Sequence, residues 1–349
     1  MQIRSSRIAA LGERCAHVLF ELPSRMLHEA LAPPRHGRLL RRAAGAALRM
    51  PGACPLLRAY VRYAHAALVP APAIERADAE LSRRGRPFRA RTVFGAVVSG
   101  NTRDFIQRYL YLFGIWEPNL TQWLGGCLRR GDTFVDVGAN IGYFSLLAAK
   151  LVGPGGRVVA IEASPGIFAA LARHVEHNGA DNVRLMQCAV ADTRGRLRLY
   201  RAPEWNLGAT SLYCEPGFVE EGEVDAAPLS ELLTRAEAER ARVIKIDVEG
   251  AEAAAVRGLL PLLPSLRDDA ELVVEVGGGP RGARGPDTAR AVIGMLCGHG
   301  FNVYRLENDY APTAYRAGGA CARPRRVRDG GSVTGECDLV FSRRDAPAL

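Results

Sequence analysis

The feature that most constrains the fold is the stretch GDTFVDVGANIGYFSLLAAK at residues 131–150. Residues 133–138 predict a strand that is apolar on both faces, and a glycine-rich turn joins it to a predicted helix over residues 143–153. We expect that helix to end at Gly153, with Pro154 beyond it. A strand buried on both faces is typical of a parallel sheet covered by helices. The stretch therefore predicts one unit of an α/β fold.

The rest of the chain repeats this alternation of apolar strands and helices. Ser164 and Pro165 suit the N-cap and first position of the second helix. The expected strands of the main sheet are residues 133–138, 157–163, 182–192, 241–250, 270–276, 301–306 and 337–344. They predict a mostly parallel seven-stranded sheet with helices on both faces. Ligands bind at the carboxyl ends of such strands, so we expect Asp136, Glu162 and Asp247 around one crevice.

The net charge of +9 is concentrated near the N-terminus, where residues 1–90 hold 16 Arg and six acidic residues. Apolar spacing within residues 8–31, 39–50 and 56–68 predicts helices, so we expect residues 1–88 to form a basic, mainly helical N-terminal extension. Such a segment can pack on the main domain, or lie on an anionic membrane or a nucleic acid. Packing is favoured because no face is strongly basic opposite an apolar one. We expect no nucleic-acid partner, because the aromatic residues are not interleaved with the arginines, whereas peripheral membrane contact stays open.

Cysteine usage and hydropathy favour a cytoplasmic protein. The eight Cys residues are scattered without Cys-x-x-Cys or Cys/His ligand spacing, which favours reduced thiols over disulfides or a zinc site. Glu13, Arg14 and Glu21 interrupt any apolar run of a signal peptide, and no apolar stretch is long enough to span a membrane. We expect no metal centre. Mg²⁺ has enough carboxylates to choose from, but no ligand signature supports it.

The turn after the first strand is small and glycine-rich, like a nucleotide-binding loop. Gly138, Ala139 and Gly142 let a ligand approach the backbone and let the helix begin close to the strand. Asn140 stands where many such loops carry Gly. Because Asn tolerates the left-handed backbone region, the turn is kept, and the Asn140 amide can bond a ligand.

Asp136 restricts the class of ligand that this turn can bind. Its carboxylate, two residues before Gly138, would repel a pyrophosphate but could pair with the ammonium group of S-adenosylmethionine, directly or through water. Glu162 follows the second strand, where an acid can accept hydrogen bonds from ribose hydroxyls. NAD and S-adenosylmethionine share that feature, so Glu162 alone does not separate them. A tight connection with a surface acid is the structural alternative.

Four motifs together resemble the FkbM-type methyltransferases. They are VDVGANIGYFSLLAAK, the EASP turn at residues 162–165, NLGATSLY at residues 206–213 and VIKIDVEGAE at residues 243–252. WEP at residues 116–118 also fits a motif that precedes the first strand in this family. The resemblance covers about residues 89–345, which we expect to be the methyltransferase domain. It implies a class I, Rossmann-like methyltransferase fold, S-adenosylmethionine as the cofactor and O-methylation as the reaction.

The resemblance and the loop together predict the cofactor site. The predicted cofactor-binding residues are Glu117, Asp136, Gly138, Ala139, Asn140, Gly142, Tyr143, Glu162, Ala163, Cys188 and Ala189. One departure concerns the adenosine side: the family often has Pro directly after the strand-two acid, whereas Ala163 and Ser164 come before Pro165 here.

The KIDVEGAE segment is the predicted catalytic centre. Lys245, Asp247 and Glu249 share one facing parity along a strand, and Asp247 falls at its carboxyl end. We expect Asp247 to act as the base or hydroxyl anchor for a weak alcohol nucleophile, supported by the other two. A purely structural Lys–acid pair is the alternative.

The predicted substrate-binding residues are Asn206, Thr210, Ser211 and Glu275. They lie on the NLGATSLY loop and at the end of the fifth strand, where a loop can close over a bound substrate. Trp116 and Trp205 are expected to stack on a ligand or to lie in the core. His174 is expected on a helix surface.

The leading hypothesis is an S-adenosylmethionine-dependent O-methyltransferase acting on a hydroxyl of a sugar, glycan, lipid or polyketide-like metabolite. Small-molecule acceptors and glycan- or lipid-linked acceptors are equally allowed. The alternatives are a nicotinamide-dependent oxidoreductase and a non-catalytic protein that retains the fold. No pattern predicts the oligomeric state.

Overall fold

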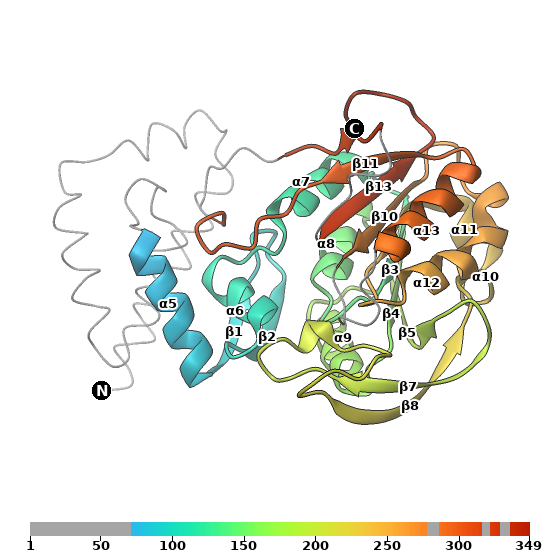
Figure 1. Cartoon of the computed structure of the whole chain (residues 1–349). Helices are drawn as coiled ribbons and strands as arrows, with labels where there is room; N and C mark the ends of the chain where they lie inside the picture. Colours follow the sequence, from blue (N-terminus) through green and yellow to red (C-terminus); the bar gives the residue numbers. More distant parts are fainter. Residues whose placement is uncertain (1–70, 278–285, 316–321, 329–335) are drawn as a thin grey trace, which may run out of the picture.

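A computed structural model describes residues 71–277, 286–315, 322–328 and 336–349 (Figure 1). Its largest element is an eight-stranded sheet in the order β12-β11-β13-β10-β9-β3-β4-β5. These strands are β3 (Thr133–Val137), β4 (Arg157–Glu162), β5 (Val183–Gln187), β9 (Ala241–Ile246), β10 (Glu271–Val276), β11 (Asn302–Leu306), β12 (Arg325–Arg326) and β13 (Cys337–Ser342). The helices predicted within the first 70 residues lie outside the described part of the chain.

The central strands of this sheet pair in parallel. β10, β9, β3, β4 and β5 form a parallel run, and β13 is antiparallel to both β10 and β11. The predicted mostly parallel α/β sheet is confirmed. Each of the seven predicted segments contributes a strand. The eighth strand, β12, is a two-residue edge strand that lies outside the seven predicted segments.

Helices cover both faces of the sheet (Figure 1). One face packs against α7 (Pro118–Cys127), α8 (Tyr143–Val152) and α9 (Pro165–His177). The other packs against α10 (Leu229–Leu232), α11 (Arg235–Arg240), α12 (Glu252–Leu259), η3 (Leu260–Ser265) and α13 (Pro286–Gly298). Successive residues of a strand point to opposite faces, so Phe134 joins the first core while Val135 and Val137 join the second.

A second sheet of three strands lies below the main one in Figure 1. It consists of β6 (Ala189–Val190), β7 (Gly195–Arg201) and β8 (Val219–Ala227) in the order β6-β8-β7. The single strand predicted over residues 182–192 is therefore wrong. It divides at Cys188, whose N–H donates to the carbonyl of Glu162 where β4 ends, and the residues after it pair with β8 instead.

The N-terminal part of the described chain packs against α7–α9. Helix α5 (Ala71–Arg84) and helix α6 (Phe105–Leu112) flank a hairpin of β1 (Pro87–Arg91) and β2 (Val97–Asn101). Ile74, Ala77 and Leu81 of α5 are buried in the same core as the first face of the sheet. The domain boundary after residue 88 stays a prediction. No helix among the described residues has the length and hydropathy to cross a membrane.

His174 is buried rather than on the surface of α9, which corrects the prediction. Its Nδ1 lies 2.8 Å from the carbonyl of Ile141 in the glycine-rich turn, and its Nε2 lies 2.9 Å from the backbone nitrogen of Ser99 in β2. Burial lowers the pKa of His174, so the neutral ring can accept at Nε2 and donate at Nδ1. The ring thereby ties the turn and the hairpin to α9.

Candidate active site

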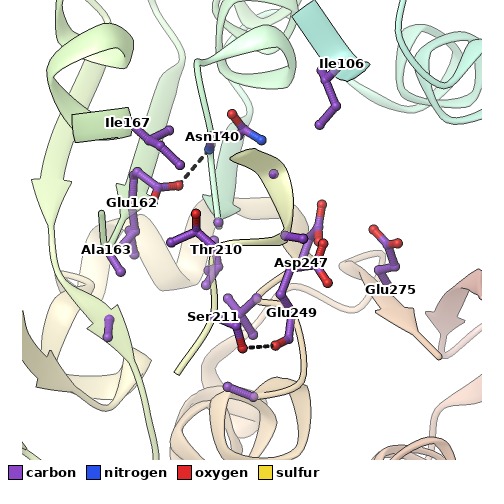
Figure 2. Close-up of a pocket in the computed structure, with 18 of the residues that line it drawn as sticks. Ile106, Asn140, Glu162, Ala163, Ile167, Thr210, Ser211, Asp247, Glu249 and Glu275 are labelled. Atoms are coloured by element: carbon purple, nitrogen blue, oxygen red, sulfur yellow. Dashed lines mark hydrogen bonds between the residues drawn. The ribbon is translucent and has the colours of Figure 1, made fainter. Parts of the chain in front are cut away.

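A cavity opens at the carboxyl ends of β3, β4, β9 and β10, where the sequence predicts the ligand (Figure 2). The predicted site residues that line it are Glu117, Gly138, Asn140, Glu162, Ala163, Cys188, Ala189, Asn206, Thr210, Ser211, Asp247, Glu249 and Glu275. Figure 2 shows Glu162 on one side of the pocket and Asp247 and Glu275 on the other. The fold thus brings most of the predicted residues together.

The turn after β3 has the close approach that only glycine allows. Gly138 has a φ of 79°, and a Cβ built there would lie 1.7 Å from the carbonyl oxygen of Asp247. Asn140 has a φ of 50°, which confirms that Asn occupies the left-handed region. Its side-chain oxygen accepts from the N–H of Ile141. The turn and the end of β9 are therefore packed backbone to backbone.

Glu162 is fixed by the backbone around it. Its two carboxylate oxygens accept from the N–H groups of Asn140 and Ser164, each at 2.9 Å. Burial raises the pKa of Glu162 to about 7, although these two hydrogen bonds oppose the rise. Each oxygen keeps a lone pair that can accept a hydroxyl proton. Ala163, Ile167 and Cys188 supply apolar wall on this side of the cavity.

Asp247 lies at the other side and is held by Lys245. The Nζ of Lys245 donates to Oδ2 of Asp247 at 2.6 Å. Burial opposes the charge of Lys245, but Asp247, Asp136 and Glu117 outweigh it and raise the pKa of the ammonium group. The Lys245–Asp247 pair places a carboxylate in the cavity and its counter-ion beneath it.

Some predicted site residues support the cavity instead of lining it. They are Asp136, Ala139, Gly142, Tyr143 and Lys245. Asp136 is buried opposite Lys245 in the β3–β9 register and accepts from Ser145 Oγ at 2.5 Å. Burial raises the pKa of Asp136, and Lys245 opposes the rise. Gly142 begins α8 with a φ of 92°, where a Cβ would lie 2.6 Å from Leu171.

The strand ends before Glu249, so the parity argument does not reach that residue. β9 stops at Ile246, and Glu249 adopts a left-handed φ of 49° in the following turn. Its carbonyl accepts from Ser211 Oγ at 2.7 Å (Figure 2). That bond joins the end of the catalytic segment to the NLGATSLY loop.

Asp104 positions the same loop, although it was not predicted from the sequence as a site residue. Its two oxygens accept from the N–H groups of Gln107 in α6 and Leu207 in η2 (Leu207–Ala209). Asn206 and Thr210 flank η2 and line the cavity. Burial raises the pKa of Asp104 to about 6, with the two backbone bonds opposing.

Glu117 and Glu275 form an acidic end of the cavity. Glu275 lies opposite Asp338 in the β10–β13 register, and burial raises its pKa well above the usual range. Glu117 accepts from the hydroxyl of Tyr310 at 3.0 Å. Trp116 stacks on Tyr310 with ring centroids 5.4 Å apart, and both line the cavity.

Other lining residues were missed from the sequence: Phe105, Ile106, Tyr310 and Glu336. Phe105 and Ile106 lie at the start of α6, which carries none of the predicted motifs. Tyr310 and Glu336 lie in or beside a stretch that shows no periodic pattern. Trp205, in contrast, is 60% exposed and does not line the cavity.

The cavity carries no basic side chain among the described residues, since no Lys, Arg or His lines it. Nor do the described residues bring three His, Cys, Asp or Glu side chains together in an arrangement that could hold a metal ion. The arrangement can accept hydrogen bonds at both sides, stack an aromatic group and bind positive charge.

Comparisons with known proteins match the part of the chain that forms most of the main sheet. The family described as Methyltransferase FkbM domain matches residues 136–303. The 31-O-demethyl-FK506 methyltransferase FkbM of Streptomyces tacrolimicus is 34% identical over 206 residues, which cover 50% of this chain and 75% of that protein. Methyltransferase 1 of Beauveria bassiana is 30% identical over 148 residues, which cover 37% of this chain and 59% of that protein.

Solved structures resemble the chain more distantly. Methyltransferase FkbM from Methylobacillus flagellatus KT has a TM-score of 0.36 and 14% identity, with 66% of this chain and 52% of that chain covered. A SAM-dependent O-methyltransferase from Thermotoga maritima has a TM-score of 0.35 and 11% identity, with 74% and 79% covered. These structural similarities are weak, so the family match and the two sequence relatives are the informative comparisons.

Proposed function

The chain belongs to the FkbM family of S-adenosylmethionine-dependent methyltransferases, and from that premise we propose that it methylates a hydroxyl group of its acceptor. The observation that carries this proposal is the Lys245–Asp247 pair. It supplies a carboxylate at the carboxyl end of β9, in the same cavity as Glu162. An alcohol is a weak nucleophile, so a positioned base is the feature that O-methylation requires.

The residues of the cavity suit the cofactor. Glu162 would accept from the ribose hydroxyls, and the apolar wall of Ala163, Cys188 and Ala189 would face the adenine. Asn140 would bind the amino-acid end. Asp136 lies beneath the cavity, so it would act on that end through the field of its carboxyl group and not as a lining contact.

The reaction then follows from where the side chains lie. When bound, S-adenosylmethionine would supply an electrophilic methyl group, which would pass to the acceptor oxygen as the carbon–sulfur bond breaks and S-adenosylhomocysteine leaves. Lys245 occupies Oδ2 of Asp247, which leaves Oδ1 to accept the proton of the acceptor hydroxyl. Glu275 would anchor a second polar group of the acceptor. The loop of Asn206 to Ser211 would close the cavity against water.

The charge of the cavity weighs against a nicotinamide cofactor. Glu117, Asp247 and Glu275 line it, and no Lys, Arg or His is among the described residues that line it, so a pyrophosphate would meet repulsion. The non-catalytic alternative is less favoured because the Lys245–Asp247 pair is intact. The acceptor we propose is a sugar, glycan, lipid or polyketide-like compound, either free or attached to a carrier.

The test is methyl transfer by the full chain to a panel of hydroxylated acceptors, with the methyl group located by mass spectrometry. We expect a methyl ether, and Asp247→Asn should lower turnover about 100-fold or more while S-adenosylhomocysteine still binds. Asp192→Asn is the control, since it makes the same change at a partly exposed surface pair with Arg257. Methylation on nitrogen or carbon alone, or full activity of Asp247→Asn, would contradict the proposal.

We also propose peripheral membrane contact through the basic N-terminal region. The charge of residues 1–70 supports it. Its test is salt-sensitive retention on anionic vesicles by the full chain and by a chain that begins at residue 71. The truncation spares α5, which contributes Ile74 and Leu81 to the core. Equal retention of the two proteins would contradict membrane contact.

A further inference from the structure

The acidic end of the cavity holds more carboxyl groups than the basic side chains of the described residues balance. The side chains of Asp136, Glu275 and Asp338 lie on one face of the sheet, and Asp247 follows the end of β9 beside them. Glu117, at the N-terminus of α7, faces this group of carboxyl groups. Lys245 is the buried cation among them, and it is bonded to Asp247. Burial, and then the neighbouring acids, raise the pKa of Glu117 and Glu275 well above the usual range.

Glu117 is only partly compensated by the described residues around it. It is 3% exposed, and its Oε2 has no hydrogen-bond partner among the described residues, although Oε1 accepts from Tyr310. A buried carboxylate oxygen left without a partner is costly, and so is a φ of 40° for a residue other than glycine. Because Glu117 lines the cavity, a ligand can reach it.

Aromatic rings form the wall beside these acids. Trp116 and Tyr310 stack at an interplanar angle of 24°, and Phe105 meets Trp116 edge-on at 5.5 Å. All three line the cavity. Aromatic faces next to carboxylates attract a cation more strongly than either group alone, because the ring quadrupole and the negative charge act together.

We propose that this acidic, aromatic end of the cavity binds a protonated amine of the acceptor, so that the preferred acceptor is a hydroxyl compound that also carries an ammonium group. The inference rests on the proposed function and deepens it. Glu117 and Glu275 are the specificity-determining residues, and Trp116 and Tyr310 form the aromatic wall. The excess of carboxyl groups favours an ammonium over a neutral polyol, since a neutral group leaves the charge uncompensated.

The ammonium and sulfonium of the cofactor offer the same chemistry from another source. Glu117 and Glu275 interact most strongly with Asp338 and Asp247, on the β9–β10–β13 side, whereas the expected ribose acid Glu162 lies across the cavity at β4. This arrangement favours the acceptor as the source. The experiment below therefore keeps the cofactor position filled.

The test uses the full chain saturated with S-adenosylhomocysteine and two matched probes at pH 7.5. Cyclohexylamine is charged at this pH, and cyclohexanol is a neutral molecule of the same shape. Ligand-observed NMR should give a dissociation constant for the amine about tenfold lower than for the alcohol. Glu117→Gln and Glu275→Gln should each remove most of that preference, because Gln keeps the size of Glu without its negative charge. Retained S-adenosylhomocysteine binding shows that each variant is folded.

Glu239→Gln is the control for the loss of one negative charge, because Glu239 pairs with Arg235 on the surface of α11. It should keep the full preference for the amine. Equal binding of the two probes, or binding of neither, would overturn the inference. An amine that binds only without S-adenosylhomocysteine would assign the site to the cofactor and also overturn it. Failure of S-adenosylhomocysteine itself to bind would be seen first, and would contradict the proposed function together with this inference.

Discussion

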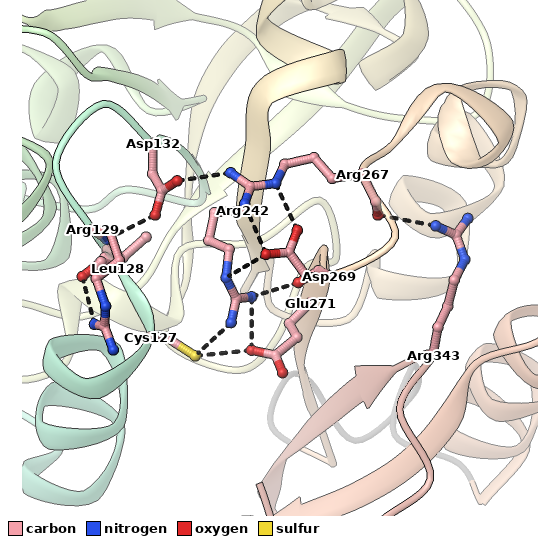
Figure 3. Close-up of polar contacts among 9 residues, drawn as sticks. All are labelled: Cys127, Leu128, Arg129, Asp132, Arg242, Arg267, Asp269, Glu271 and Arg343. Atoms are coloured by element: carbon pink, nitrogen blue, oxygen red, sulfur yellow. Dashed lines mark hydrogen bonds and ion pairs between the residues drawn. The ribbon is translucent and has the colours of Figure 1, made fainter.

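The two ends of the main sheet both carry buried charge, but they differ in whether that charge is balanced. At the amino ends of β3, β9 and β10, arginines meet the acids in a continuous network (Figure 3). At the carboxyl ends, one lysine faces several acids. Balanced charge can hold a structure together without a ligand, whereas unbalanced charge requires protons or a ligand to offset it.

At the amino end each acid has an arginine. The guanidinium group of Arg267 donates to both carboxylate oxygens of Asp269 at 2.6 and 2.7 Å and to Oδ1 of Asp132 at 2.7 Å (Figure 3). Hydrogen bonding by Arg267 lowers the pKa of Asp269. Arg242 donates to Glu271 at 2.9 Å. These residues join the strand starts to the loop before β10.

At the carboxyl end three buried acids have raised pKa values instead of lowered ones. Burial is the main cause for Asp136, Glu162 and Asp338, and each is shifted upward. Asp136 and Asp338 each keep one buried oxygen without a partner among the described residues. The difference between the two ends supports our proposal that the ligand binds at the carboxyl end.

The largest expected effect compares the two glycines that bracket β3. Gly138→Ala should destabilise the protein by more than about 3 kcal/mol, because its Cβ would meet the Asp247 carbonyl at 1.7 Å. Gly131→Ala, with a similar φ of 88° and open space around it, should cost only about 1–2 kcal/mol. Urea unfolding measures both. Equal losses would show that the turn after β3 is not packed as described.

The second prediction concerns the charge network at the amino ends of the strands, where arginines balance the acids. Arg242→Ala should lower the free energy of unfolding by about 2–4 kcal/mol, since it leaves the buried carboxyl group of Glu271 without its arginine. S-adenosylhomocysteine affinity should stay near that of the parent. Arg235→Ala, which breaks an exposed pair with Glu239, should leave stability unchanged. A loss of binding without a loss of stability in Arg242→Ala would contradict the structural role of this end.

The third prediction is that acids at the two ends of the sheet change the free energy of unfolding with pH in opposite directions. The pKa values of Glu162 and Asp338 are raised to about 7 and about 6, so their contribution to stability is present below pH 4 and is lost as pH rises to 7. The free protein should therefore lose about 1–3 kcal/mol of unfolding free energy between pH 5 and 8. Denaturant titrations at the two pH values measure it.

A pair of asparagine variants separates the two ends in that measurement. Asp338→Asn should flatten the dependence between pH 5 and 8, because it removes one titrating group while Asn308 keeps an oxygen to donate to. Asp269→Asn should leave the pH dependence of stability between pH 5 and 8 unchanged, since the lowered pKa of Asp269 confines its effect to acid pH. Stability that rises between pH 5 and 8 in the free protein would contradict the excess of buried acid.

Much of the fold and part of the site follow from the sequence, because their signals are local. The apolar runs of β3, β4, β9 and β10 and the left-handed Asn140 could be predicted from residue type and spacing. The division at Cys188 could not, since it depends on pairing with β8, whose half-polar sequence carries no strand signal.

Residues that join the site through tertiary contacts could not be predicted from the sequence. Asp338 belongs to the acidic end only because β13 pairs with β10, and Tyr310 reaches Glu117 from a stretch without periodicity. His174 looks like a surface residue on a helix, yet both ring nitrogens contact partners far away in the sequence. Such residues carry their signal in the fold and not in the local pattern.

The most direct test of the central claim is a calorimetric titration of S-adenosylhomocysteine into the full chain at pH 7.5, with NAD⁺ titrated in parallel. We predict one micromolar site for S-adenosylhomocysteine and no binding of NAD⁺. Glu162→Ala should weaken binding about tenfold or more, because hydrogen bonds to a charged group are lost. Glu204→Ala, an exposed acid outside the cavity, should not weaken it. Binding of NAD⁺, or full affinity in Glu162→Ala, would contradict the placement of the cofactor in this cavity.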